Sequence, residues 1–279
     1  MRSPSLGRRI AAAAIVLLLV IPVVQGCSVL ERMRDGETES IDDAPPIESR
    51  GADWPVLPRE GGKDGYDDPF EGVNRVFFYV NGALDFLVFE PVARFYRGFM
   101  PTDVRHSVSR GFTNMAEPIV TANHLLQLKP NRAATSFGRF VVNSTAGAAG
   151  LFDVATDLGL EADDADFGQT LHHYGVGEGP YLVLPIFGPT TARDAVGLGV
   201  DGVIDPRAYL LALAPRAALA AGEGVVRREE VIDPVEFLVK HAFDHYEAVR
   251  AWNYQERLRE LTGGCTEPKH VICPGYSPK

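Results

Sequence analysis

The residue with the clearest chemistry is Cys27, which follows the run Val24-Gln25-Gly26. Upstream, three arginines within the first nine residues precede an apolar stretch over residues 10–24. A basic start, a short apolar stretch and a small residue before the cleavage point are the layout of a secretory signal peptide. An aliphatic residue followed by Gln, Gly and Cys is typical of the bacterial lipobox. The pattern predicts removal of residues 1–26 and lipidation of Cys27, and the alternative is an ordinary signal peptide with an incidental cysteine.

Lipidation at Cys27 would decide where the mature protein resides. Each buried acyl CH₂ contributes roughly 0.8 kcal/mol, and two acyl chains already make a stable anchor. The apolar stretch itself is shorter than the roughly 20 residues that span a bilayer. Ser28 follows the cysteine, where an inner-membrane retention signal would usually place Asp. We therefore expect a lipid-anchored protein on the periplasmic face of the outer membrane.

Two histidine pairs are candidates for metal binding. His172 and His173 are adjacent, so their side chains point in different directions on any regular element. His241 and His245 are four residues apart on a predicted helix, which is the zincin spacing, but Ala242 stands where the general-base Glu would follow. We interpret both pairs as solvated or partner-facing residues, and we expect no metal and no cofactor.

Motifs for other catalytic chemistry are missing from the sequence. It contains no Gly-x-Ser-x-Gly nucleophile elbow and no Walker A loop. Gly175, Gly177 and Gly179 alternate with other residues, but no strand is predicted before them and Pro180 follows, so the dinucleotide-binding context is absent. A flexible loop explains them better, and we predict that the protein is not an enzyme.

The charge of the chain excludes some classes of ligand. The 279 residues include 27 basic and 37 acidic residues, for a net charge of −10, and removing the three N-terminal arginines leaves it near −13. Nucleic-acid binding depends on phosphate neutralisation by Lys and Arg, so this chain is a poor candidate. Attraction to anionic lipid through charge alone is equally unfavourable. Membrane contact should therefore be hydrophobic or through the anchor.

The two ends of the mature chain differ from its middle. Residues 27–66 are rich in Asp, Glu, Pro and Gly, which predicts a lipidated, flexible acidic tether. Residues 263–279 form a short tail that contains Cys265 and Cys273. In an oxidising periplasm this pair is a candidate disulfide, and zinc is the weaker alternative because only His270 is near enough to add a ligand.

The folded body is predicted to begin with a helix near residue 67. Asp68 is expected to be its N-cap, Pro69 its first residue and Glu71 the acid that completes a capping box. Residues 73–99 are then apolar on nearly every side, as in a helix that is buried in a core or faces lipid. Pro91 is expected to divide this stretch into two helices.

The remaining sequence is also mainly helical. Three segments show apolar residues at the 3.6-residue spacing, with prolines as interruptions, and the last should start with Asp233 as its cap and Pro234 as its first residue. The single short strand signal is at 181–184. These patterns predict a mostly α protein with Gly- and Pro-rich connections. The three segments are 102–128, 131–142 and 225–261, with Pro118 and Pro234 inside them.

Three motif segments together resemble one family, the MlaA (VacJ) outer-membrane lipoproteins. The resemblance covers roughly residues 67–206, and Val73 stands where the family more often has an aromatic residue. From Pro206 onward the chain is similar only in general character. The segments are 68–75 (Asp-Pro-Phe-Glu-Gly-Val-Asn-Arg), 116–155 (beginning Ala-Glu-Pro) and 167–194 (with His-Tyr-Gly-Val-Gly and Gly-Pro-Tyr).

This resemblance implies a fold and a function. It implies a ring-shaped, mostly helical body, here residues 67–262, embedded in the inner leaflet of the outer membrane. Its channel would remove mislocalised phospholipids from the outer leaflet and pass them to a periplasmic carrier of the MlaC type, which would maintain lipid asymmetry. Trimeric porins are the implied membrane partners. The alternative is a lipid-anchored envelope hydrolase or scaffold, which should show a nucleophile and a base in motif context.

Candidate channel or gate residues follow from these segments. The helix that begins near Asp68 is suited to set how the body sits in its leaflet. Glycines in the stretches 147–152 and 173–180 permit unusual backbone conformations and could form a wall that moves as lipid passes. For any single glycine, the alternative is a plain turn or a close-packing site. The candidates are Asn74, Phe77, Gly147, Gly150, Tyr174, Gly175 and Gly177.

Overall fold

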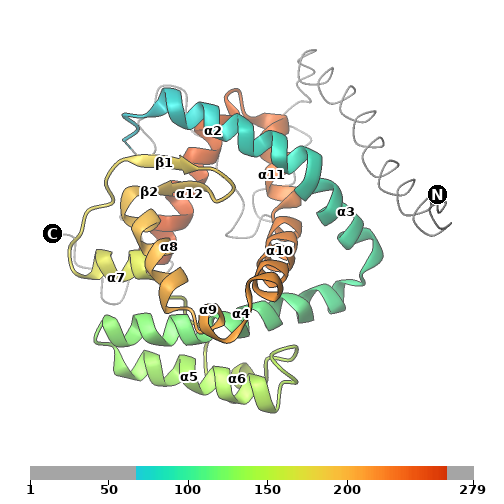
Figure 1. Ribbon diagram of the computed structural model, residues 1–279, viewed down its shortest axis with the longest axis vertical. Coiled ribbons are helices and arrows are strands. Elements are labelled where there is room, and N and C mark those ends of the chain that lie inside the picture. The colour runs from blue at the N-terminus through green and yellow to red at the C-terminus, as the bar shows by residue number, and fades with distance from the viewer. Residues whose placement is uncertain (1–66, 263–279) are drawn as a thin grey trace, which may run out of the picture. The chain divides into compact units, whose positions relative to one another are not determined.

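A computed structural model describes residues 67–262 of the chain (Figure 1). The predicted signal peptide, the lipidation site Cys27, the tether and the pair Cys265 and Cys273 lie outside the described residues. The described body is mostly α-helical, as predicted. Its helices follow one another around a ring in the ribbon view, with one β-hairpin on the inner side of α2 (Figure 1).

The elements occur in the following order. The first half comprises α2 (Glu71–Leu84), the π-helical turn η3 (Asp85–Phe89), α3 (Glu90–Phe99), α4 (Thr102–Leu126), α5 (Pro130–Thr145), α6 (Val154–Asp157) and α7 (Phe167–His173). The second half comprises β1 (Tyr181–Leu184), β2 (Gly188–Thr191), α8 (Ala192–Ile204), α9 (Arg207–Leu210), α10 (Leu213–Glu230), α11 (Ile232–His241) and α12 (His245–Thr262).

The segment from α2 to α3 is one continuous helical stretch, so the predicted division at Pro91 is wrong. Pro91 lacks a backbone N–H and would leave a carbonyl without its usual partner in a regular helix. The π turn η3 directly precedes it, and the Glu90 N–H bonds to the Asp85 carbonyl five residues back. The wider π turn thus changes the hydrogen-bond pattern just before the proline, so the helix continues although Pro91 has no N–H to donate.

The start of α2 also differs from the expectation. Phe70, not Asp68, is the N-cap residue, and no side chain caps this end. The side chain of Asp68 is only 2% exposed because it is turned into the body, where it bonds to Asn74. The predicted capping box at Asp68 and Glu71 is therefore wrong: a buried polar partnership uses the aspartate instead.

The helices at 102–128 and 131–142 are confirmed as α4 and α5, and Pro118 lies inside α4 without ending it. The predicted helix at 225–261 is instead three elements, the end of α10 followed by α11 and α12. Asp233 does not cap α11, which begins at Ile232, since its carboxylate bonds to Arg97 of α3. Tertiary ion pairing has overridden the local capping signal.

The strand predicted at 181–184 is confirmed as β1. It pairs antiparallel with β2, with Tyr181 opposite Thr191 and Leu184 opposite Gly188. The partner strand was not predicted because its sequence, Gly-Pro-Thr-Thr, lacks alternating large apolar residues. A two-stranded hairpin is marginal by itself, so its free edge needs another element.

Helix α2 covers that free edge with side-chain amides. Asn74 donates a hydrogen bond from Nδ2 to the Tyr181 carbonyl at 3.0 Å and accepts one at Oδ1 from the Val183 N–H at 2.9 Å. The amide therefore makes the two bonds that a neighbouring strand would make. Asn74 is 2% exposed, so neither bond has water as a ready substitute.

A second asparagine repeats this contact two helical turns later. Asn81 donates to the Leu184 carbonyl and accepts from the Ile186 N–H, both at 2.8 Å. The seven-residue spacing places both amides on one face of α2. Together they tie α2 to β1 along the length of the strand.

Large apolar side chains gather at this same place. Tyr181, Val183 and Tyr246 form a buried cluster, against which the half-buried Phe77 and Phe78 pack. Six of the other buried apolar residues are alanines, at 93, 133, 155, 165, 248 and 251. The remaining ones, Val226, Ile232, Phe237 and Leu238, lie in α10 and α11, so the large apolar side chains of the described body form more than one small buried group.

The two asparagines provide a test of this edge pairing. Asn74→Leu should lower the free energy of unfolding by about 3 kcal/mol, because it leaves a buried N–H and a buried carbonyl without partners. Asn81→Leu is the matched control, and it should lower that free energy by less than about 1 kcal/mol because water can reach the Ile186 N–H. Urea unfolding followed by circular dichroism measures both. Equal losses would contradict the role assigned to Asn74.

Candidate functional site

The motif segments found in the sequence converge into three buried polar clusters. We call them the α2–β1 joint, the α4–α5 joint and the α8–α12 joint, after the elements that they connect. Each joint combines residues that are distant in the chain. The members are Asp68, Asn74, Tyr246 and Arg250; Glu117, Arg139, Asn143 and Asp153; and Asp166, Arg193, Asp194 and Arg257.

At the α2–β1 joint, Asp68 accepts hydrogen bonds from three groups. Asn74 Nδ2 donates at 2.7 Å, the Tyr246 hydroxyl donates, and Arg250 Nη1 lies at 3.4 Å. Burial, together with the bond to Asp68, raises the pKa of the Tyr246 hydroxyl, which keeps this group a donor. The predicted site residues Asn74 and Phe77 thus both belong to this joint and its apolar cluster.

At the α4–α5 joint, Arg139 bridges two carboxylates. Its Nε donates to Glu117 at 3.0 Å, and its Nη2 donates to both oxygens of Asp153 at 3.1 Å. Burial raises the pKa of Glu117 despite the arginine. Burial also acts to raise the pKa of Asp153, but hydrogen bonds from Thr156, Asn143 and Arg139 outweigh it and lower this pKa to about 2.

Gly147 and Gly150 lie in the turn that follows α5. A Cβ atom on Gly147 would lie 2.2 Å from the Phe152 carbonyl oxygen and 2.6 Å from the Asn143 carbonyl oxygen. Gly150 has φ +90°, and a Cβ there would lie 2.5 Å from the Asn114 Cβ. Gly147 needs glycine because backbone atoms lie too close, and Gly150 because of its positive φ and the Asn114 side chain. Both therefore fit the alternative of a turn or a close-packing site.

At the α8–α12 joint, Arg257 of α12 holds two carboxylates from other elements. It donates to Asp166 at 2.6 and 2.9 Å and to Asp194 at 2.8 and 3.2 Å. Arg193 donates to the same Asp194 at 3.0 Å. Two arginines and burial act in opposite directions on Asp194, and the net effect lowers its pKa. Arg257 lies in the C-terminal part, where the family motifs do not extend, and sequence reasoning missed it.

The predicted site residues Tyr174, Gly175 and Gly177 lie in the loop after α7. The Tyr174 hydroxyl donates to the Leu126 carbonyl at the end of α4, at 2.6 Å. Gly175 has φ +83°, a conformation that favours glycine. No atom lies within 4 Å of a Cβ built on Gly177, so this glycine faces open space. The loop is therefore held at Tyr174 by a hydrogen bond, while its backbone at Gly177 borders open space.

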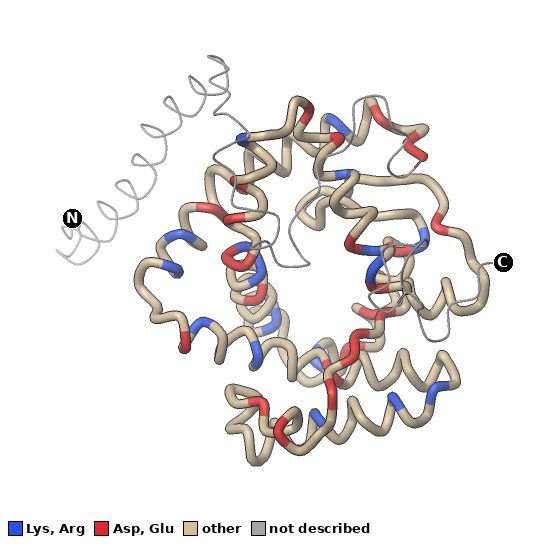
Figure 2. The backbone as a smooth tube through the Cα atoms, turned by 180° about the vertical axis from the view of Figure 1, so that it is seen from behind, with Lys and Arg blue, Asp and Glu red and all other residues tan. Residues whose placement is uncertain are grey.

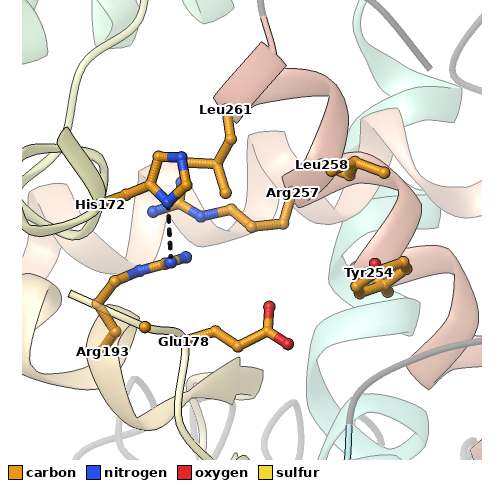
Figure 3. Close-up of a pocket in the computed structure, with 8 residues that line it drawn as sticks. His172, Glu178, Arg193, Tyr254, Arg257, Leu258 and Leu261 are labelled. Atoms are coloured by element: carbon orange, nitrogen blue, oxygen red, sulfur yellow. Dashed lines mark hydrogen bonds between the residues drawn. The ribbon is translucent and has the colours of Figure 1, made fainter. Parts of the chain in front are cut away.

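The open part of this loop borders a pocket of about 330 Å³, which we call the α12 pocket. Figure 3 shows His172 and Arg193 on one side, Glu178 below, and Tyr254, Leu258 and Leu261 of α12 across from them. His172 Nδ1 lies 3.4 Å from Arg193 Nη1. Burial and the nearby Arg193 lower the pKa of His172. The lining residues are His172, Gly177, Glu178, Arg193, Tyr254, Arg257, Leu258 and Leu261.

The seven predicted channel or gate residues thus fall into three places rather than one. Asn74 and Phe77 lie at the α2–β1 joint, Gly147 and Gly150 beside the α4–α5 joint, and the 174–177 loop beside the α12 pocket. Sequence reasoning missed Asn81 and Glu178. The seven-residue spacing from Asn74 could have indicated Asn81, whereas nothing in the local sequence indicates Glu178.

The histidine pair at 241 and 245 does not share one helix, contrary to the expectation. His241 ends α11 and His245 begins α12. His241 Nδ1 lies 2.8 Å from the Phe237 carbonyl oxygen, and His245 Nε2 lies 3.0 Å from that of Val239. Each imidazole ring therefore contacts a backbone carbonyl of a nearby residue. Between residues 67 and 262, no group of three His, Cys, Asp or Glu residues could hold a metal ion.

Helix α2, the turn η3 and helix α3 expose many apolar side chains. The stretch 71–99 is the one helix in the described range that is long and apolar enough to cross a membrane, by length and composition only. Phe95 and Phe99 are 71% and 70% exposed, and their rings stack 5.9 Å apart. The sequence allowed this stretch to be either buried in a core or facing lipid. The structure excludes burial in a core, because most of its side chains are exposed. Other exposed members are Val73, Val76, Tyr79, Val80, Leu87, Val88 and Val92.

Charged residues connect this apolar side to the rest of the ring. Arg97 of α3 donates to Glu229 at 2.8 Å and to Asp233 at 2.7 Å. Arg228 of α10 donates to both oxygens of Asp85 in the π turn, at 2.6 and 2.8 Å. Figure 2 shows basic and acidic positions interspersed along α10. Ion pairs therefore hold α3 and η3 against α10 and α11.

Two glycines differ in the space that they leave, which gives a test of their roles. Gly147→Ala should lower the free energy of unfolding by about 3 kcal/mol, because the new methyl group meets backbone atoms that cannot rotate away. Gly177→Ala should change it by less than about 0.5 kcal/mol, since a surface substitution into open space is usually tolerated. Thermal and urea unfolding compare the two variants. A Gly147→Ala protein of wild-type stability would show that this turn moves freely.

The lowered pKa of Asp153 predicts a pH dependence of stability. The unfolded carboxylate should titrate near its usual value of about 3.9. The folded one titrates at about 2, so its stabilisation is complete above pH 4 and is lost as the pH falls from 4 to 2. Asp153→Asn should flatten the slope of unfolding free energy against pH in this range. Asp157→Asn, which changes an exposed carboxylate at the end of α6, the helix that Asp153 caps, should keep the wild-type slope.

Comparisons with known proteins agree with the motif segments. A protein-family model described as MlaA lipoprotein matches residues 66–260. The intermembrane phospholipid transport system lipoprotein MlaA of Escherichia coli (strain K12) is 33% identical over 215 residues, which are 74% of this chain and 83% of that protein. An uncharacterized protein of Rickettsia prowazekii (strain Madrid E) is 34% identical over 208 residues, or 74% of this chain and 81% of that one.

A solved structure is also similar over most of the body. It is described as the structural basis for maintenance of bacterial outer membrane lipid asymmetry, and it is 34% identical with a TM-score of 0.60. The similarity covers 68% of this chain and 96% of that one. The family model therefore matches the region that holds all three joints. This chain belongs to the MlaA lipoprotein family.

Proposed function

We propose that this protein is an outer-membrane lipoprotein that transports phospholipids between membranes and so maintains outer-membrane lipid asymmetry. The observation that carries the proposal is the family match over residues 66–260, together with an E. coli relative that is named for this transport system. The family is one of transport lipoproteins, so the protein is not an enzyme. This counts against the alternative of an envelope hydrolase.

The anchor follows from the sequence and from this family. A lipoprotein needs a lipidated cysteine, and Cys27 is the cysteine that ends the lipobox pattern. Acyl chains on Cys27 would hold the mature protein at the outer membrane, with its body on the periplasmic side. The acidic residues between the anchor and α2 would give the body the freedom to reach its place in the leaflet.

The exposed apolar side of α2, η3 and α3 supports a body that sits in one leaflet. Exposed apolar patches on a soluble monomer rarely exceed a few hundred Å², and larger ones mark contact with a membrane or a partner. Here exposed Val, Leu and Phe side chains extend along the whole stretch 71–99. In this proposal, the acyl chains of the leaflet cover the exposed apolar side chains of the stretch 71–99.

A channel through the ring would solve the problem of moving an amphipathic molecule. A phospholipid has a polar headgroup, which loses free energy in an apolar medium unless polar groups or water surround it. The ring of helices combines exposed apolar residues on α2 and α3 with ion pairs on α10 and at the α8–α12 joint. Transport through such a ring would need a polar route but no bond to be made or broken.

The partners belong to the same proposal. Intermembrane transport needs an acceptor that carries lipid across the aqueous periplasm, so we infer a soluble carrier of the MlaC type. We also infer a trimeric porin as a neighbour in the outer membrane, on the resemblance to the family. The chain is acidic overall, so we do not expect general electrostatic attraction to anionic lipid to bring it to these partners.

The candidate channel or gate residues have distinct roles in this proposal. Asn74 and Phe77 would fix the angle between α2 and the hairpin, and so the depth of the apolar side in its leaflet. Gly147 and Gly150 would keep the α4–α5 turn compact. Tyr174, Gly175 and Gly177 would allow the loop beside the α12 pocket to adjust as lipid moves.

The test of the function is lipid analysis of the outer leaflet in a deletion strain. Loss of the gene should raise the amount of phospholipid that reagents or phospholipases can reach at the cell surface, and the wild-type gene should restore it. Cys27→Ala should fail to restore it, because the unlipidated chain no longer fractionates with the outer membrane. Ser28→Ala, a change at the next position that keeps the cysteine, should restore it.

These outcomes separate two claims. A deletion strain with a normal outer leaflet would refute the transport function. Full rescue by a membrane-bound Cys27→Ala protein would refute only the anchor, and the stretch 71–99 would then have to hold the protein at the membrane.

A further inference from the structure

The α12 pocket contains one carboxylate that the rest of the fold does not use. Within residues 67–262, the side chain of Glu178 makes no hydrogen bond and no ion pair, although its backbone carbonyl accepts from the Arg193 N–H at 3.1 Å. Figure 3 shows the carboxylate pointing into the space between Arg193 and Tyr254. Burial raises the pKa of Glu178, and the charge of Arg193 offsets only part of this effect.

The two arginines of the pocket are already neutralised. Arg257 is paired with Asp166, Asp194 and Glu260. Arg193 is paired with Asp194, at 3.0 Å from Nε. The carboxylates around these two guanidinium groups therefore compensate their charge, and Glu178 is left in excess. A ligand with a positive charge is favoured at this point over a simple anion.

The other walls of the pocket suit a small organic cation. The ring of Tyr254 lies across from Glu178, and aromatic faces attract alkylammonium groups. Leu258 and Leu261 add apolar surface for carbon atoms. A volume of about 330 Å³ is at the lower end of the range for small-molecule pockets, so it can take a headgroup but not whole acyl chains.

We propose that the α12 pocket binds the primary ammonium group of an aminophospholipid headgroup of the phosphoethanolamine type, and that Glu178 pairs with it. The inference rests on the proposed transport function and names the substrate class for it. Because both guanidinium groups of the pocket are already paired with carboxylates, the ammonium group and not the phosphate is the part of the headgroup that the site recognises. Glu178 is then the residue that selects an amine headgroup over a glycerol headgroup.

Photocrosslinking in a defined membrane tests this directly. The full-length lipidated protein carries a benzophenone amino acid at position 261, on the wall of the pocket, and is reconstituted with equal amounts of phosphatidylethanolamine and phosphatidylglycerol that have the same acyl chains. Mass spectrometry of the captured lipid gives the ratio of the two headgroups. The ethanolamine lipid should be captured in excess.

The variants assign the preference to Glu178. Glu178→Gln should lower the ratio of ethanolamine to glycerol lipid by about tenfold, as expected for loss of one hydrogen bond between charged groups. Glu161→Gln is the matched control because it removes the same charge from an exposed residue outside the pocket, and it should leave the ratio unchanged. N-acetylated phosphatidylethanolamine has no ammonium charge. With Glu178 in place, it should no longer be captured in excess over phosphatidylglycerol, although the protein and its fold are unchanged.

Three results would overturn the inference. They are equal capture of both lipids, a ratio that Glu178→Gln and N-acetylation leave unchanged, and a crosslink from position 261 to a protein in place of lipid. The same benzophenone protein is also tested for rescue of the deletion strain. Rescue without amine preference overturns the pocket assignment alone, whereas a deletion strain with a normal outer leaflet overturns the transport function.

Discussion

Helices that follow a ring cannot all pack on one apolar core, and this constraint explains most of what holds the body together. One apolar cluster surrounds Tyr181, Val183 and Tyr246, and other large buried apolar residues, Ile232 and Leu238 among them, lie in α11. Many of the remaining contacts between helices are buried hydrogen bonds and ion pairs, such as Arg139 with Glu117 and Arg257 with Asp194. Removing one partner of a buried pair leaves an uncompensated charge, so each joint has essentially one satisfactory geometry.

The same constraint separates the two sides of the wall. Large apolar residues that a globular protein would bury are exposed along α2 and α3. The polar joints lie between the helices instead. The ring is thus held by polar contacts between helices while its long first helix leaves apolar surface free for a membrane or a partner.

Elements with a strong local pattern could be predicted from the sequence, and elements set by distant contacts could not. Helices α4 and α5 and strand β1 follow from apolar spacing within short windows. The capping roles expected for Asp68 and Asp233 failed because each carboxylate has a partner more than 100 residues away in the chain, Tyr246 and Arg97. Local rules cannot include such partners.

The candidate site shows the same division. The motif segments contain Asn74, Glu117, Arg139 and Asp194, but their sequence does not show that these residues meet in separate joints. Arg257 completes one of them from a helix with little motif character. Glu178 can be identified only from the structure, because the sequence does not show whether a carboxylate has a partner.

The π turn at Asp85–Phe89 has a consequence for how the long helix faces its surroundings. An α-helix advances about 100° per residue, so one extra residue in a turn rotates everything after it by roughly that angle. The apolar stripe of α3 therefore does not continue that of α2 but is offset around the axis. Arg97 of α3 contacts Glu229 of α10, while Phe95 and Phe99 remain exposed. The π turn thus lets one long helix present two differently directed faces.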